Sequence, residues 1–109
     1  MSLTINIHYT GEGGAARRFA EEMEASGTAD EIRAEEGNLA YRYYFPADDP
    51  ESVLLIDRWH DQVALDAHHA SPMMARIAQL RDKYDLHMRV ERFADLVDGG
   101  DDDKVFIWE

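Results

Sequence analysis

The chain switches between two hydrophobic periods, and the order of these switches limits the folds open to it. Residues 3–9 alternate apolar and polar side chains, as a strand with one buried face does. Apolar residues then recur at helical spacing over 16–23, which predicts an amphipathic helix. A Ser-Gly-Thr sequence at 26–28 predicts a break, after which a second short helix should run through Ile32 and end near Gly37.

The second half of the chain places two strands before its helical segment. Residues 39–45 and 52–60 are rich in aromatic and branched side chains, and the loop between them contains two prolines, which predicts a hairpin. Asp61 is a candidate N-cap for the next helix, and Ser-Pro at 71–72 is a second helix start. Residues 86–94 return to the alternation of a strand.

The resulting order, β-α-β-β-α-β, predicts an α+β fold of the ferredoxin-like split βαβ type, with the helices on one face of a four-stranded sheet. The strands at 41–45 and 53–56 carry aromatic or apolar side chains on both faces. A strand with apolar side chains on both faces needs both faces to be covered by other parts of the protein. The helices cover only one face of the sheet. We therefore predict a homodimer whose sheets pack face to face. The alternative is a monomer with a few exposed apolar side chains, which is common.

A change in composition divides the chain into two parts. Residues 1–95 are predicted to form the folded domain. Residues 95–103 hold five Asp and two Gly, so 96–109 is predicted to be an acidic linker that leads to a short apolar, strand-like tail at 105–108. We expect this tail to dock on the partner subunit or along a sheet edge.

Composition excludes several classes of partner and chemistry. With 23 acidic and 11 basic residues, the net charge of -12 disfavours nucleic acid and anionic membranes as partners. The sequence has no cysteine, which excludes disulfides and thiolate metal sites and favours a cytoplasmic location. We find no secretory signal and no apolar run near the ~20 residues of a membrane span.

One stretch of sequence resembles a known family. The third predicted strand closes on Asp-Arg-Trp-His-Asp at 57–61, and Ala-Leu-Asp-Ala-His-His-Ala-Ser-Pro follows at 64–72. This spacing of Trp, His and Ser-Pro resembles the signature of antibiotic biosynthesis monooxygenase domains. The resemblance implies a dimeric α+β barrel with a cavity between sheet and helices. It also implies oxidation of quinols or anthrones by O2, with no cofactor.

His68 is the candidate catalytic residue within this signature. On a helix that lines an apolar cavity, a neutral imidazole can accept a phenolic proton, and the electron-rich phenolate can then pass an electron to O2 without a metal. The alternative is a packing or capping histidine. His69 would point about 100° away around the helix. No His, Asp or Glu grouping has the spacing of a metal site, so we expect no metal and no other cofactor.

Five further residues are candidates for binding the substrate. Trp59 can stack on a planar ligand or pack in the core. Asn6 can donate a hydrogen bond to a substrate oxygen or lie on the exposed side of its strand. Tyr43 can line either the cavity or the dimer barrel. Met73 and Met74 follow the Ser-Pro pair where many relatives have a histidine, which implies a softer, more apolar pocket.

Asp57 and Arg58 alternate on the third strand and therefore face opposite sides of the sheet. An unpaired buried charge is costly, so we expect one of the two to be buried and paired, most simply with an opposite charge across the dimer.

The sequence thus predicts a cofactor-independent monooxygenase or oxidase that acts on a small aromatic quinol, phenol or anthrone-type substrate. The alternative is a non-catalytic dimer of the same fold that binds a small ligand or acts as a regulator. Haem-degrading enzymes share the fold. By the same resemblance, however, His68 stands where they carry a Trp, and Ile77 or Ala78 where they carry the haem-ligating His, which disfavours haem as substrate.

Overall fold

The computed structural model describes residues 2–95, so the predicted linker and tail, and the docking expected of that tail, lie outside the described residues. The chain forms eight elements in sequence order. They are β1 (Leu3–Thr10), α1 (Ala15–Ala25), α2 (Thr28–Arg33), β2 (Asn38–Tyr44), β3 (Ser52–Trp59), α3 (Gln62–His69), α4 (Met73–Lys83) and β4 (His87–Ala94).

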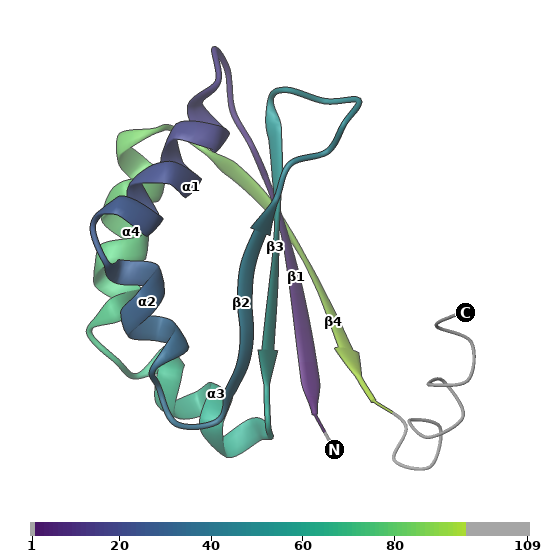
Figure 1. Ribbon diagram of the computed structural model, residues 1–109, viewed down its shortest axis with the longest axis vertical. Coiled ribbons are helices and arrows are strands. Elements are labelled where there is room, and N and C mark those ends of the chain that lie inside the picture. The colour runs from purple at the N-terminus through teal and green to yellow at the C-terminus, as the bar shows by residue number, and fades with distance from the viewer. Residues whose placement is uncertain (1, 96–109) are drawn as a thin grey trace.

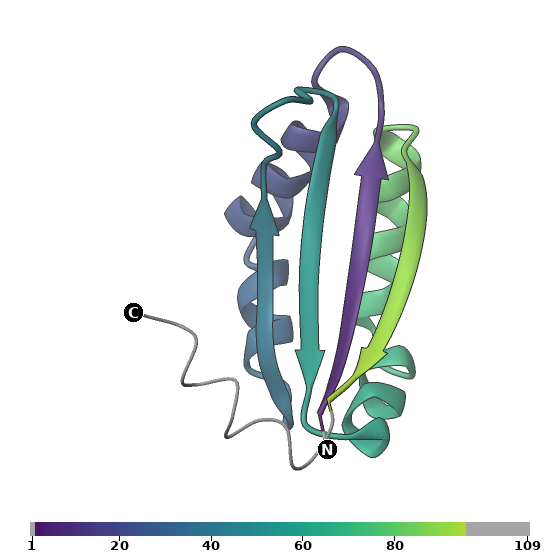
Figure 2. The same cartoon turned by 90° about the vertical axis from the view of Figure 1, so that its right-hand side faces the viewer.

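The four strands form one sheet in the order β2-β3-β1-β4, and every neighbouring pair is antiparallel (Figure 2). The helices lie together on one face of this sheet (Figure 1). The observed order is the ferredoxin-like α+β arrangement predicted from the sequence, with each of the two helical segments divided in two. None of the helices within residues 2–95 is long and apolar enough to cross a lipid bilayer.

Local signals place most of the helix ends. Gly27, with a φ of 82°, separates α1 from α2 at the predicted break. Asp61 caps α3, because its Oδ1 accepts a hydrogen bond of 2.9 Å from the backbone N–H of Ala64.

The expected end of the second helix near Gly37 is wrong, because α2 stops at Arg33. Gly37 instead shapes the turn into β2, where its carbonyl accepts a hydrogen bond of 2.7 Å from the backbone N–H of His60. Its φ is +83°, and a Cβ there would lie 2.4 Å from the Cβ of Ala64. This turn therefore needs a glycine for both conformation and space.

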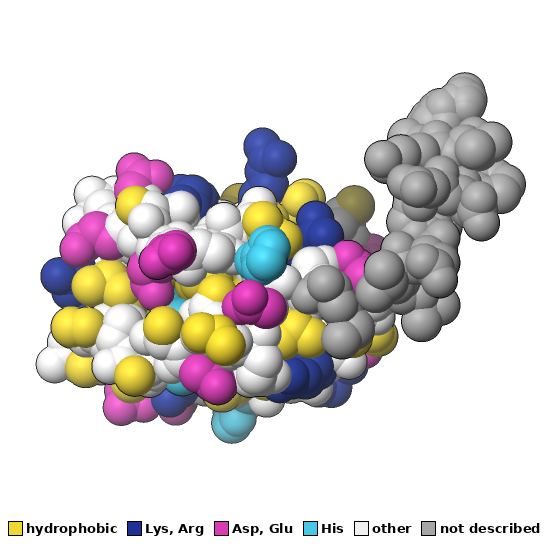
Figure 3. Space-filling view, turned by 90° about the horizontal axis from the view of Figure 1, so that it is seen from below, with side chains coloured by type: hydrophobic (Ala, Val, Ile, Leu, Met, Phe, Trp, Pro, Cys, Tyr) yellow, Lys and Arg dark blue, Asp and Glu magenta, His cyan; other side chains and the backbone are white. Residues whose placement is uncertain are grey.

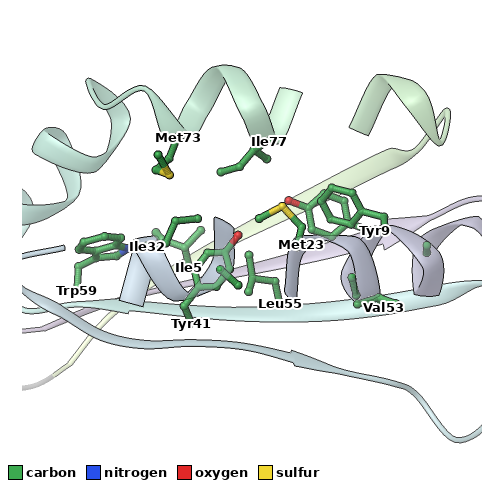
Figure 4. Close-up of a cluster of buried hydrophobic side chains, with 14 of the residues drawn as sticks. Ile5, Tyr9, Met23, Ile32, Tyr41, Val53, Leu55, Trp59, Met73 and Ile77 are labelled. Carbon is green, nitrogen blue, oxygen red and sulfur yellow. The ribbon is translucent and has the colours of Figure 1, made fainter. Parts of the chain in front are cut away.

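The core lies between the sheet and the helices. Odd-numbered residues of β1 and β3 face the helices, among them Ile5, Tyr9 and Leu55. Met73 and Ile77 project from α4 toward this surface (Figure 4). The alternation of the two strands therefore selects which side chains can contact the helical layer.

The opposite face of the sheet has no cover from any element of residues 2–95, and we call it the open face (Figures 1 and 2). Leu54 and Ile56 of β3 lie half-buried on it. Tyr44 and Phe93 lie on the same face and are 44% and 50% exposed. At the end of the molecule that carries α3, by contrast, hydrophobic, acidic and basic side chains are intermixed (Figure 3). The open face thus has the apolar character on β3 that motivates the predicted dimer.

Candidate active site

A cavity of about 270 Å³ lies between the helical layer and the sheet. All four strands contribute to one wall, and helices α3 and α4 form the other. Most of its lining is apolar, including Ile5, Leu55, Leu65, Met74, Ile77 and Val90. Met88 and Val90 of the edge strand β4 are about half exposed, so the cavity reaches the surface beside this strand. An apolar space of this kind suits a small aromatic molecule.

His68 lines this cavity and is held by a carboxylate. Its side chain is only 4% exposed, and its Nδ1 lies 3.1 Å from each carboxylate oxygen of Glu35. A carboxylate only accepts hydrogen bonds, so Nδ1 carries a proton and donates it, and in the neutral ring the lone pair is on Nε2. Nε2 has no hydrogen-bond partner among the described residues. The pair therefore presents a base on the side of the ring away from Glu35.

Glu35 is a site residue that the sequence analysis missed. It lies in the turn between α2 and β2, 33 residues before His68 in the chain. No local spacing links the two residues, because only the packing of this turn against α3 brings them together.

Trp59 packs against the face of the imidazole ring. The two rings are stacked, with centroids 4.7 Å apart and an interplanar angle of 26°. Trp59 is fully buried and is not among the residues that line the cavity. Its indole therefore packs against His68 instead of presenting a face to a ligand.

Asp57 is the second site residue that the sequence analysis did not assign. It lies two positions before Trp59 on the same face of β3, is 5% exposed and lines the cavity. Burial, helped by the nearby negative charge of Glu35, raises its pKa to about 7, although hydrogen bonds from the side chains of Trp59 and Asn38 act in the opposite direction. Residues two positions apart on a strand point to the same side of the sheet. The spacing of Asp57 and Trp59 was therefore the sequence signal that could have placed Asp57 on this face.

The expectation of an ion pair for Asp57 differs from the structure. Among the described residues Asp57 has no basic partner, and the amide Nδ2 of Asn38 lies 3.5 Å from its Oδ1. Arg58 points to the open face, where its guanidinium lies 3.4 Å from the carboxylate of Asp95. Of Asp57 and Arg58, the buried residue is therefore Asp57, and it faces the helices of its own subunit.

The remaining candidate residues fall in three places. Met74 lines the cavity, whereas Met73 is buried in the core. Tyr43 packs behind the cavity wall, and its hydroxyl lies 3.1 Å from that of Tyr41, which does line the cavity. The structure thus brings Met74 together with His68, and leaves Met73 and Tyr43 in the surrounding core.

Asn6 lies on the open face, between two residues, Ile5 and Ile7, whose side chains line the cavity on the opposite side of β1. Its Oδ1 is buried and has no hydrogen-bond partner within residues 2–95. The structure does not bring Asn6 together with His68.

The charged side chains of the cavity lie where it meets the surface. His69 and Arg92 are exposed, and Arg81 is half-buried. In the part of the chain that the structure describes, no group of three or more His, Asp or Glu side chains could hold a metal ion.

A helix-covered antiparallel sheet with a buried histidine beside a carboxylate defines a small α+β protein with an apolar cavity. Residues 2–80 match the family model described as antibiotic biosynthesis monooxygenase, and the chain belongs to this family. The family resemblance drawn from the Trp, His and Ser-Pro spacing is thereby confirmed. A search of curated proteins finds no match.

Solved structures share the fold over most of the chain. Rv0793 from Mycobacterium tuberculosis is 24% identical, with a TM-score of 0.72 over 88% of this chain and 96% of that one. SnoaB from Streptomyces nogalater, a cofactor-independent oxygenase, is 20% identical, with a TM-score of 0.72 over 87% and 93%. A conserved protein from Methanosarcina mazei Go1 is 18% identical, with a TM-score of 0.76 over 88% and 94%.

Proposed function

We propose that this protein oxidises a small aromatic quinol, phenol or anthrone-type substrate with O2 and needs no cofactor for the reaction. The observation that carries the proposal is the position of His68. Its imidazole is oriented by Glu35 and lines an apolar cavity of about 270 Å³. SnoaB, a cofactor-independent oxygenase with the same fold, supports this reaction type.

The first step is removal of a hydroxyl proton by Nε2 of His68. The imidazolium that forms is stabilised by the adjacent carboxylate of Glu35. The substrate anion is electron-rich, so it can transfer an electron to O2, which enters apolar space readily. The apolar lining keeps water away from the anion and strengthens the electrostatic interactions of the site.

We also propose that the protein acts as a homodimer joined through its open faces. The half-buried apolar side chains of Leu54 and Ile56 support this arrangement, since a second sheet would remove them from water. Because the cavity lies on the opposite side of the sheet, association through the open face leaves the cavity accessible.

Oxygen uptake with a panel of hydroquinones, phenols and anthrones, with a metal chelator present, tests the proposed reaction. Loss of a general base costs typically 10²–10⁴-fold in rate, so His68→Ala should lower turnover by about that factor. The rate should rise with pH through the range in which an imidazole titrates, because only the neutral ring accepts a proton.

The matched control is His60→Ala, since His60 is an exposed histidine that contacts Asp61 at the surface. It should leave turnover unchanged. Equal rates for His68→Ala and the wild type would assign His68 a packing role. If no substrate is oxidised faster than in the protein-free blank, the non-catalytic ligand-binding dimer is the better description.

A further inference from the structure

Asp57 is a buried carboxyl group that the proton transfer to His68 does not use. It comes from β3 on the sheet side of the cavity, whereas His68 comes from α3 on the helix side. Trp59 connects the two, because it lies two residues from Asp57 on the same face of β3, a separation of ~6.6 Å along a strand. Its ring also stacks on that of His68. One ligand in the cavity can therefore contact both groups.

We infer that Asp57 accepts the second proton of a substrate that carries two ionisable oxygens, so that the preferred substrate is a hydroquinone or catechol and not a phenol with one hydroxyl. This inference rests on the proposed function and narrows its substrate class.

The surroundings of Asp57 favour a role in proton transfer over a structural one. A carboxyl group that stabilises a fold is normally paired or receives several hydrogen bonds. Asp57 has no basic partner within residues 2–95. Its neutral neighbours are the Asn38 amide, at 3.5 Å, and the indole N–H of Trp59, and their hydrogen bonds do not offset the effect of burial on its pKa. Buried ionisable groups with strongly perturbed titration, at the wall of a cavity, are typical of catalytic sites.

The titratable and charged groups around Asp57 come from every element that borders the cavity. They are Glu35 and His68 on one side, Tyr9, Tyr41 and Tyr43 from the sheet, and His69, Arg81 and Arg92 at the surface end. Burial raises the pKa of Tyr9 to about 12 and that of Tyr41 well above its ordinary value, so both phenols stay neutral near pH 7. Because burial also raises the pKa of Asp57 to about 7, its carboxylate and its acid are both populated there.

The reaction balances with O2 as the oxidant. Both O–H bonds of the hydroquinone break, one proton going to Nε2 of His68 and the other to the carboxylate of Asp57. Two electrons pass from the ring to O2, and the hydroquinone becomes a quinone. The two protons then move to the reduced oxygen as hydrogen peroxide, which restores neutral His68 and ionised Asp57. A phenol with one hydroxyl has only one O–H proton to lose, and that proton goes to His68.

The test compares Asp57→Asn with Asp82→Asn, a change at an exposed aspartate on α4. Hydroquinone and a monohydric phenol are supplied as separate substrates, and oxygen uptake is followed from pH 5 to 9. We expect Asp57→Asn to lower kcat on hydroquinone by about 10²-fold, at the low end of the range for a proton-transferring group. We expect KM on hydroquinone, and the rate on the phenol, to change little.

The pH profile separates proton acceptance from a purely structural effect. With two groups that must be unprotonated, the acid limb of log(kcat/KM) for hydroquinone should have a slope of two in the wild type and in Asp82→Asn. The slope should be one in Asp57→Asn. A slope of one in the wild type would overturn the inference, as would equal losses of rate on the phenol and the hydroquinone.

A carboxyl titration followed by 13C NMR tests the assignment without turnover. The wild type should show one aspartate carboxyl carbon that titrates near pH 7, and this signal should persist in Asp82→Asn. If every aspartate titrates below pH 5, the inference is wrong even when the asparagine variant fails to fold. If the wild type is active and Asp57→Asn has no effect, this inference alone is rejected. If the wild type is inactive, the proposed function is rejected as well.

Discussion

Nδ1 of His68 lies 3.1 Å from both carboxylate oxygens of Glu35, so a turn after α2 fixes the orientation of a ring carried by α3. The carboxylate selects the tautomer with its proton on Nδ1, and in the proposed reaction it would stabilise the imidazolium formed after proton transfer. These two effects make the contact a target for mutation that does not touch the proposed base itself.

Glu35→Ala should lower kcat and leave KM nearly unchanged, because Glu35 acts on the substrate only through His68. A hydrogen bond to a charged group contributes about 1.5–3 kcal/mol, so the expected loss is about 10- to 100-fold. Steady-state oxygen uptake measures both constants. The control is Glu36→Ala, which removes an exposed carboxylate from the neighbouring position. If the two variants behave alike, Glu35 does not orient the base.

Trp59→Phe should lower kcat several-fold with little effect on KM, because the indole contacts His68 and does not line the cavity. A rise in KM with an unchanged kcat would instead indicate that the ring stacks on the substrate. Because Trp59 is fully buried, the smaller ring should also lower the free energy of unfolding of the protein by about 1–2 kcal/mol. Urea denaturation measures this change.

Asp57 should make the protein less stable as the pH rises. Its carboxyl has a pKa of about 7 in the folded chain against a model value of 3.8, so the folded state binds the proton more tightly. This contribution to stability is complete below about pH 4 and is lost as the pH rises through 7.

Asp57→Asn should therefore raise the melting temperature relative to the wild type at pH 8 and have much less effect at pH 4. At ~1.4 kcal/mol per pKa unit, the gain at pH 8 is bounded by about 4 kcal/mol. Calorimetry at the two pH values checks the sign. A gain of the same size at both pH values would show that the carboxyl is ionised in the folded protein throughout this range.

Light scattering coupled to size exclusion should give about twice the chain mass of 12.5 kDa. Ile56→Glu should weaken association more than 100-fold, because it places a charge in the proposed interface at a cost of about 3–5 kcal/mol. Val63→Glu is the control, since Val63 is an exposed apolar residue of α3, outside the open face. A monomeric wild type at micromolar concentration would exclude the dimer.

Features with local causes were predictable from the sequence, and those that depend on distant contacts were not. The break at Gly27 and the cap at Asp61 follow from the residues themselves. The helical residues Met73 and Met74 point about 100° apart, so one sequence motif supplied a core residue and a cavity residue. Glu35 has no such local signal, because only the packing of its turn against α3 decides which side chain it contacts.

Asp57 was misjudged for a different reason. The two-sided apolar pattern of 53–56 correctly indicated that both faces of β3 carry apolar side chains, but it does not say which partner a buried charge on that strand will meet. Its raised pKa depends on the desolvation created by helices far away in the chain. Asn6, in contrast, alternates with Ile5 and Ile7 in the sequence, which predicts that it points to the opposite side of the strand. The structure places it there.

In β3 the side chains of neighbouring residues point to opposite faces of the sheet and so contact different surroundings. Positions 53, 55 and 57 face the helices, and 54, 56 and 58 face outward. An insertion of a single residue would turn the inward-facing side chains outward and the outward-facing ones inward. The number of residues in β3 is therefore strictly constrained. Individual substitutions are not constrained in the same way. Selection for a new ligand can change the inward positions while the outward ones stay fixed, so the proposed ligand choice and the proposed self-association can evolve independently within eight consecutive residues.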